Sequence, residues 1–121
     1  MEQLTNLSLT QKQQLPGKLL LLETQLAGFQ FYEGRQVVEQ LASNNKLILK
    51  RDTENKVDIN AVEVYWKQHK LGFIPATDNV VIGQMMDRGE QLTAYTLQLK
   101  NSFNPWNCVG VGVGVYWEGS L

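Results

Sequence analysis

Hydrophobic and polar residues alternate over several short stretches of the chain, and this period of two is typical of β-strands. In the first stretch a run of leucines leads into alternation around Gly28. A glycine inside a strand predicts a bulge or a close approach of another backbone. The predicted strands cover residues 18–31, 47–49, 61–66, 71–74, 92–100 and 109–117.

Two segments have the spacing of amphipathic helices instead. Residues 35–42 form the first, which places on one face Val37, Val38, Leu41 and Ala42. The second is capped by Thr77 or Asp78 and ends at Gly89, a residue type favoured just beyond a helix. Its apolar face is predicted to carry Val81, Ile82, Met85 and Met86.

The predicted strands are joined by turns rather than by long helical crossovers, so the expected fold is mainly β with one or two short helices. A small antiparallel barrel of about six strands, OB-like or SH3-like, suits this length. Residues 18–121 are expected to form this single domain. Residues 1–17, which end in Pro16-Gly17, are predicted to be an N-terminal arm.

The amino-acid composition is consistent with a single small domain. The 121 residues, 43% of them hydrophobic and 19% charged, fit one globular domain. No run approaches the roughly 20 apolar residues of a membrane span, and the leucine run is too short for a signal peptide. A cytoplasmic location without membrane contact is therefore expected. The single Cys108 excludes an internal disulfide, and the single His69 argues against a zinc cluster.

The loop after the second predicted strand is unusually polar, because Asp52, Asn55, Asp58 and Asn60 fall within nine residues. A cation-binding loop is not favoured, since the segment has no glycine at its bend and carries a lysine in its middle. Asp and Asn side chains often bond nearby backbone groups and fix the exit from a turn. For Asn60 this role is favoured, whereas for Asp58 and Asn55 ligand contact is an equal alternative.

Other candidate chemistry finds little support. The glycines at 110, 112 and 114 alternate with valines and continue as a strand, whereas a phosphate-binding loop needs a helix after its glycines. His69 is expected to be solvated in a hairpin turn, and Cys108 to be a small core residue. No nucleophile and base stand together, so an enzyme is not expected and no cofactor or metal is implied.

Charge gives a mild indication of an anionic ligand. Residues 35–70 carry seven Lys and Arg against five acids, whereas the residues after them carry two against four. The aromatic residues are mostly expected in the core, namely Phe31, Tyr32, Phe73, Trp106 and Trp117. If some of them lie on the surface beside lysines, they form a stacking platform for single-stranded nucleic acid.

Several segments together resemble the HIRAN domain, in the same order along the chain. They are Gly28-Phe29-Gln30-Phe31-Tyr32-Glu33-Gly34, Leu47-Ile48-Leu49-Lys50-Arg51-Asp52, Asn55, Asp58, Asn60-Ala61-Val62-Glu63-Val64, Leu71-Gly72-Phe73-Ile74-Pro75 and Asp87-Arg88-Gly89. The resemblance covers roughly residues 23–100 and suggests a small stand-alone, bacterial-type member. It implies a modified OB-like barrel that binds DNA. In eukaryotic fork-remodelling helicases such a domain captures the 3′ end of single-stranded DNA, through stacking aromatics and an acidic residue that bonds the terminal hydroxyl.

By position, the resemblance assigns the acidic role to Asp58, a supporting contact to Asn55, and stacking to Phe31 and Tyr32. This chain also departs from those members. It has Gln30-Phe31 in place of Arg-Tyr and Val57 in place of Tyr. It has Glu54 in place of Asn, and it lacks a Lys in the region of Ile74-Pro75. The candidates within this chain for compensating phosphate contacts are Arg35, Arg51 and Lys56.

The leading hypothesis is a non-enzymatic nucleic-acid-binding module with a preference for single-stranded DNA or 3′ ends. Its candidate contacts are Phe31, Tyr32, Arg35, Arg51, Asn55, Lys56 and Asp58. The alternative is a protein-interaction module that keeps the barrel without DNA binding. Its candidate contact residues are Phe103, Trp106, Tyr116 and Trp117, because Trp and Tyr are common interface anchors.

Overall fold

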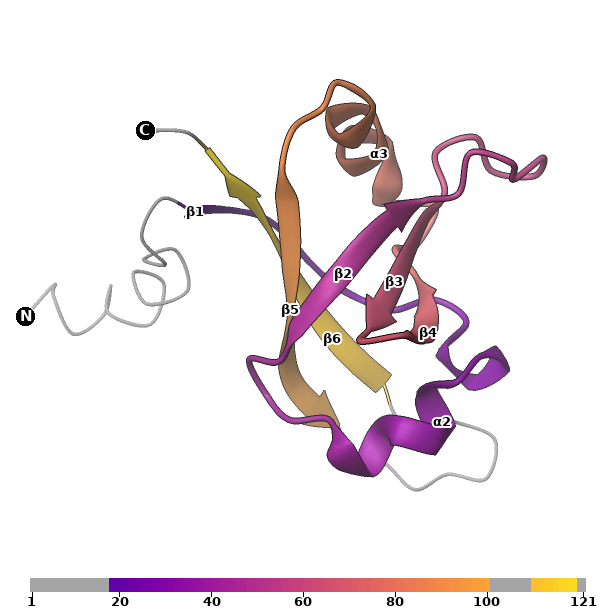
Figure 1. The fold of residues 1–121 in the computed structure, drawn as a ribbon, viewed down its shortest axis with the longest axis vertical. Coiled ribbons are helices and arrows are strands. Elements are labelled where there is room, and N and C mark those ends of the chain that lie inside the picture. Colours follow the sequence, from indigo (N-terminus) through magenta and orange to yellow (C-terminus); the bar gives the residue numbers. More distant parts are fainter. Residues whose placement is uncertain (1–17, 101–109, 120–121) are drawn as a thin grey trace, which may run out of the picture.

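The computed structural model describes residues 18–100 and 110–119, which form a six-stranded antiparallel sheet with two short α-helices (Figure 1). The strands are β1 (Lys18–Gln25), β2 (Lys46–Arg51), β3 (Val62–Trp66), β4 (His69–Phe73), β5 (Leu92–Lys100) and β6 (Gly110–Glu118). The helices are α2 (Gly34–Val37) and α3 (Asn79–Asp87), and the single-turn 3₁₀ helices are η1 (Phe29–Phe31) and η2 (Val38–Gln40). The predicted fold class is confirmed. The predicted arm, Phe103, Trp106 and Cys108 lie outside the described residues.

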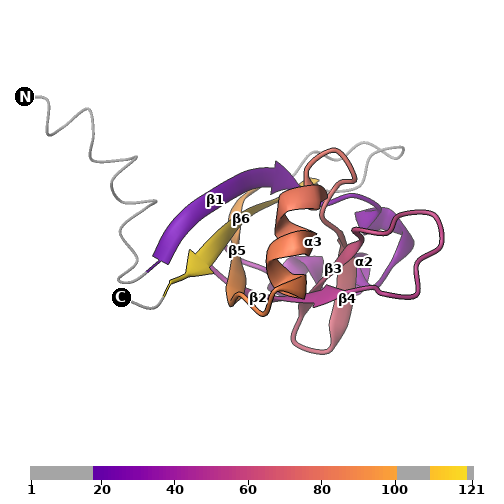
Figure 2. The same ribbon diagram turned by 90° about the horizontal axis from the view of Figure 1, so that it is seen from above.

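The strand order is β1-β6-β5-β2-β3-β4, and β2 joins the two halves of the sheet. Lys46 and Leu47 at the start of β2 pair with β5, whereas the rest of the strand pairs with β3. The sheet therefore curls, as the view from above shows (Figure 2). Its two edges are linked by one bridge, in which Ala27 and Phe73 exchange backbone hydrogen bonds of 2.8 and 3.0 Å. The barrel is thus bridged at one point, without a complete ladder between its edges.

The strand predicted for residues 18–31 ends early, at Gln25. Gly28 adopts a left-handed conformation, with a φ of 74°, and turns the chain into η1. That turn buries Phe29 and exposes the two residues that follow it. The prediction that Gly28 lies inside a strand, at a bulge or a close backbone approach, is wrong, because the residue lies beyond β1 and its positive φ forms the turn.

The core lies inside the curled sheet, and β-branched side chains fill most of it. Its fully buried residues include Val62, Val64, Leu71, Val111, Val113 and Val115. On β6 the valines point inward, whereas Gly114 leaves room for the side chains of Leu20, Leu97 and Tyr116. The Gly-Val alternation is therefore a packing device, in agreement with the rejection of a phosphate loop.

The helix α3 closes one end of the curled sheet (Figures 1 and 2). It ends at Asp87, and the predicted Gly89 follows as the C′ residue, with a φ of 85° and its N–H donated to the carbonyl of Met86. Ile82 is buried and Met86 packs against the core, but Val81 is 62% exposed, so that part of the predicted apolar face is wrong. The other predicted helix, 35–42, is divided into α2 and η2, and it still buries Val37 and Leu41.

The bridge between Ala27 and Phe73 depends on a glycine. Gly72 has a φ of 152°, and a Cβ there would overlap the carbonyl oxygen of Ala27. We expect Gly72→Ala to lower the free energy of unfolding by about 2 kcal/mol or more, because steric overlap adds to backbone strain. Urea unfolding followed by tryptophan fluorescence measures this change.

Gly89→Ala is the matched control, because Gly89 also has a positive φ but a Cβ there would meet nothing within 4 Å. It should cost only the conformational strain, about 1 kcal/mol. Equal losses in the two variants would contradict the proposed role of the bridge.

Candidate nucleic-acid interface

The polar loop between β2 and β3 is folded around its own side chains. Asn55 Oδ1 accepts hydrogen bonds from the backbone N–H groups of Val57 (2.9 Å) and Asp58 (2.8 Å). Its Nδ2 donates to Asp52 Oδ2 at 3.3 Å. These are the local bonds by which Asn side chains stabilise turns. Asn55 therefore shapes the loop.

Asp58 is oriented by groups on both sides of it. Its Oδ1 accepts the backbone N–H of Asn60 at 3.0 Å, and its Oδ2 accepts from Nδ2 of Asn79 at 2.7 Å. Asn79 is buried at the start of α3, so the helix determines where this carboxylate lies. Of the two roles left open for Asp58, the structure contains the turn-fixing bond. The role favoured for the side chain of Asn60 is not observed among the described residues, because Asn60 takes part through its backbone N–H. Each carboxylate oxygen keeps a second lone pair for a further donor.

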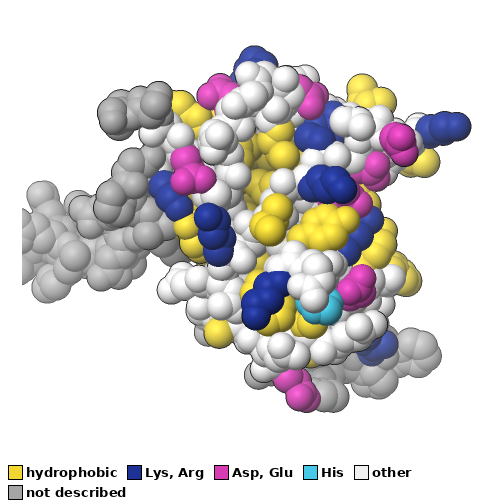
Figure 3. Space-filling view, in the orientation of Figure 1, with side chains coloured by type: hydrophobic (Ala, Val, Ile, Leu, Met, Phe, Trp, Pro, Cys, Tyr) yellow, Lys and Arg dark blue, Asp and Glu magenta, His cyan; other side chains and the backbone are white. Residues whose placement is uncertain are grey.

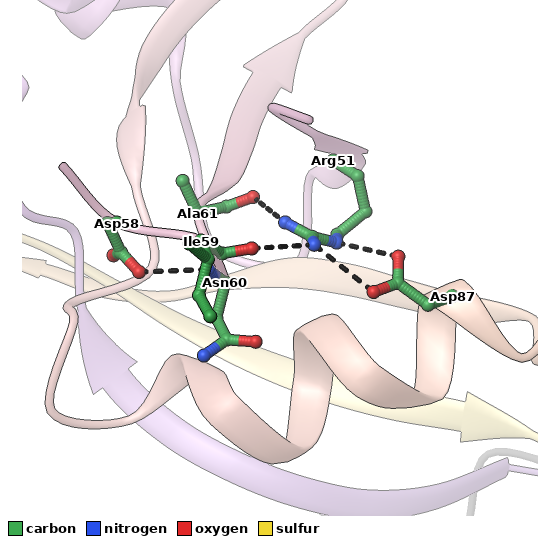
Figure 4. A network of polar contacts seen from close by, with 6 residues as sticks. All are labelled: Arg51, Asp58, Ile59, Asn60, Ala61 and Asp87. Atoms are coloured by element: carbon green, nitrogen blue, oxygen red, sulfur yellow. Dashed lines mark hydrogen bonds and ion pairs between the residues drawn. The ribbon is translucent and has the colours of Figure 1, made fainter. Parts of the chain in front are cut away.

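Arg51 fastens the end of the loop to β2 and α3 (Figure 4). Its guanidinium donates to the carbonyl oxygens of Ala61 (2.6 Å) and Ile59 (2.8 Å). It also makes a bidentate pair with Asp87, with distances of 2.9 and 3.1 Å to the two carboxylate oxygens. The hydrogen bond from Arg51 lowers the pKa of Asp87, and the same bond raises the pKa of Arg51.

Arg51 is thus engaged within the fold, and we leave it out of the contact set proposed below. Five of the loop residues are exposed instead, with Thr53 among them, and the two charged ones have no ion pair with another described residue. The apolar Val57 and Ile59 are 97% and 77% exposed. Glu54 and Lys56 are the exposed charged residues. The tip of the loop therefore presents apolar and charged groups side by side.

A second group of exposed side chains follows Gly28. Phe31 is 77% exposed and Tyr32 is 37% exposed, so these two aromatics are surface residues. The ring of Tyr32 packs edge-on against Phe73, with 5.7 Å between centroids. The ammonium of Lys70 lies 4.4 Å from the centroid of Tyr32 and 4.3 Å from that of Phe73. This geometry is a cation–π contact with both rings.

Lys70 is also paired with Glu63, at 2.8 Å. Partial burial lowers the pKa of Lys70, but the hydrogen bond and the charge of Glu63 outweigh this effect and raise it overall. The lysine therefore stays charged and holds the ring of Tyr32 in place. Sequence reasoning did not single out Lys70. Its outward position follows only from the pairing of β3 with β4.

The turn that carries the aromatics is anchored to the β3–β4 hairpin. Glu33 donates its backbone N–H to the carbonyl of Lys70 at 3.0 Å. Its Oε1 lies 2.8 Å from Nδ1 of His69, whose ring stacks on Trp66. The prediction that His69 is simply solvated is therefore wrong, because the turn approaches it from 36 residues away in the sequence.

The loop of residues 52–61 and the turn of residues 28–33 lie on the same side of the molecule in both ribbon views. Arg35 is exposed in α2, close in sequence to this turn. In the space-filling view, Lys and Arg side chains are interspersed with hydrophobic ones over β2, β3 and β4 (Figure 3). The described residues thus present exposed aromatics, cations and one oriented carboxylate on the same side of the molecule.

The aromatics proposed for a protein interface are not exposed where the structure describes them. Tyr116 is buried, and the indole N–H of Trp117 donates to Glu90 at 3.0 Å. Phe103 and Trp106 lie outside the described residues, and of the other two candidates for a protein interface Tyr116 is buried and Trp117 is half-buried. Within that part, no three His, Cys, Asp or Glu residues are grouped to hold a metal ion. None of its helices is long and apolar enough to cross a membrane.

The pair of Arg51 and Asp87 predicts a specific pH dependence of stability. Because the folded-state pKa of Asp87 is lowered from 3.8, its contribution is complete above this pH and is lost as the pH falls through the lower folded value. We expect Asp87→Asn to unfold at lower urea concentration than the wild type at neutral pH, and this difference to shrink below pH 3.8. Glu54→Gln, which removes an exposed carboxylate of the same loop, should show no such convergence. A difference between Asp87→Asn and wild type that is constant with pH would refute the pair's role.

Comparison with known proteins identifies the fold and the family of this chain. In structure, the chain is similar to a protein from Lactobacillus plantarum, with a TM-score of 0.71, 22% identity, and coverage of 83% of this chain and 94% of that chain. It is also similar to the HIRAN domain of human HLTF, with a TM-score of 0.63, 20% identity, and coverage of 85% and 80%. None of the curated proteins compared matches the chain. The model of the HIRAN domain matches residues 19–101, and the chain therefore belongs to the HIRAN domain family.

Proposed function

We propose that this domain binds single-stranded DNA and prefers strands with a free 3′ end. HIRAN domains are DNA-binding modules, and membership of the family supports nucleic-acid binding here. The observation that carries the proposal is the exposed pair Phe31 and Tyr32, with a charged lysine fixed beside Tyr32. Bases stack on such aromatic faces.

Stacking is the first part of the proposed contact. Phe31 exposes most of its ring to solvent, and it would lose this unfavourable hydration when a base covers it. Tyr32 is held by Phe73 and Lys70, so little conformational entropy is lost when a second base packs on it. Arg35 and Lys56 are exposed and have no ion pair with another described residue. They are therefore free to contact phosphates.

Recognition of the strand end is the second part. Asp58 has a carboxylate whose direction is determined by Asn79 and by the N–H of Asn60, and its remaining lone pairs can accept a hydrogen bond from a hydroxyl. A terminal phosphate would instead be repelled by the same charge. Asn55 supports this role indirectly, by shaping the loop that carries Asp58.

Removing the exposed ring should weaken binding. We expect Phe31→Ala to raise the dissociation constant for a short single-stranded oligonucleotide roughly tenfold, since base–aromatic stacking contributes about 1–3 kcal/mol. Fluorescence anisotropy at two salt concentrations measures this change. Val81→Ala is the control, because Val81 is also exposed but lies on α3, outside the proposed site. Unchanged affinity in Phe31→Ala, or wild-type binding without salt dependence, would rule out the proposed contact.

The preference for a free 3′ end should depend on Asp58. In Asp58→Asn the side chain can still accept the N–H of Asn60, and Asn79 can reverse its amide, so the loop is expected to fold. We expect this variant to bind oligonucleotides with a 3′-hydroxyl and with a 3′-phosphate about equally, whereas the wild type favours the hydroxyl. Anisotropy titrations give this ratio, and thermal melting confirms the fold.

Glu54→Gln is the charge-matched control for Asp58→Asn. It removes a negative charge from the same loop without touching the bonds of Asp58, so both oligonucleotides should bind slightly more tightly and their ratio should not change. If Asp58→Asn retains the wild-type ratio, Asp58 does not recognise the strand end.

A further inference from the structure

The outer face of β2, β3 and β4 carries a surface that the proposed function does not use. On β2 the residues Lys46, Ile48 and Lys50 are exposed, and Leu47 between them is buried. The strand register places Ile48 beside Tyr65 and Lys50 beside Glu63. Cross-strand partners share one face of a sheet, so these side chains form one continuous surface. We call the surface of Lys46, Ile48, Lys50, Glu63 and Tyr65 the sheet platform.

The sheet platform is continuous with the aromatic turn. In the sheet, Glu63 lies opposite Lys50 on β2 and opposite Phe73 on β4. The ring of Tyr32 packs edge-on against Phe73. Neighbouring strands lie about 4.8 Å apart, so Lys50 is roughly 10 Å across the sheet from Phe73. A single-stranded nucleic acid with a base stacked on Tyr32 would therefore reach the sheet platform within one or two nucleotides.

The charge of the platform is positive. Its one acid, Glu63, is paired with Lys70 at 2.8 Å and lies within 3.5 Å of the Tyr65 hydroxyl. Lys46 and Lys50 have no ion pair with another described residue. They lie four residues apart on one strand, at about 13 Å, with Ile48 between them. Two lysines spaced in this way, without ion pairs to other described residues, suit a partner with regularly spaced negative charges.

We infer that the phosphodiester backbone of a bound single strand continues from the aromatic turn across the sheet platform and contacts Lys50 and Lys46. The inference rests on the proposed function and extends it from the strand end to the nucleotides that precede it. A nucleic-acid strand is the occupant that the surface favours over an acidic protein, because the platform continues directly from the stacking pair. Tyr65, half-buried between Ile48 and Lys70, offers a further flat ring for a base.

The test compares the dependence of binding on strand length. Oligonucleotides of about three and about twelve nucleotides are titrated by anisotropy over a series of salt concentrations, the longer being within the site sizes of OB-type folds. We expect the double variant Lys46→Gln, Lys50→Gln to bind the short strand like the wild type. For the long strand its affinity should fall, and the slope of log K against log salt should shrink by about 1.4, or about 0.7 for each lost phosphate contact.

Arg88→Gln controls for a simple change in net charge, because Arg88 is an exposed cation just beyond α3. This variant should bind the short and the long oligonucleotide with wild-type affinity. If the wild type binds neither strand, the proposed function fails and the sheet platform with it. Two results would refute the platform alone, provided that the wild type binds the short oligonucleotide. In the first, the double variant keeps the wild-type slope of log K against log salt for the long oligonucleotide. In the second, it loses affinity equally for both oligonucleotides. Displacement of the long strand by polyglutamate at equal charge would assign the surface to acidic protein and also refute it.

Discussion

The guanidinium of Arg51 is the group on which the polar loop of the candidate site depends. It binds the carbonyls of Ile59 and Ala61, where the loop returns to the sheet, and the carboxylate of Asp87 on α3. One side chain from β2 thereby sets the position of the loop relative to the helix. A bidentate pair with an arginine has a defined geometry as well as favourable energy. The orientation of Asp58, which is bound to the first residue of α3, follows from this arrangement.

The structure also separates polar residues that shape the site from those that remain available to a ligand. Arg51 and Asn55 form hydrogen bonds within the protein, whereas Lys56 and Arg35 are exposed. The same division holds for the aromatics. Phe29 is buried beneath Gly34, while Phe31 and Tyr32 face solvent on the turn that Gly28 creates. Residues that are close in the sequence therefore lie in opposite environments.

Local patterns were sufficient to predict much of the fold. The strand at residues 92–100 has the predicted bounds, and the predicted glycine follows α3 as its C′ residue, because alternation and helix capping are properties of neighbouring residues. The pair of His69 with Glu33 and the position of Lys70 over two rings could not be predicted in this way. Each depends on contacts between segments far apart in the sequence. The bonds of Asp58 with Asn60 were predictable, since Asp commonly bonds a backbone group two residues on, but its bond with Asn79 was not.

The central claim is that one nucleic-acid strand is bound by the aromatic turn and the loop of residues 52–61. A ¹H–¹⁵N NMR titration of the labelled domain with a short single-stranded oligonucleotide tests it most directly. The account predicts that amide shifts concentrate at Phe31, Tyr32 and residues 56–58, while those of β1 and the last turn of α3 hardly move. Shifts that are absent at saturating oligonucleotide, or that concentrate on β1 and β6, would contradict it.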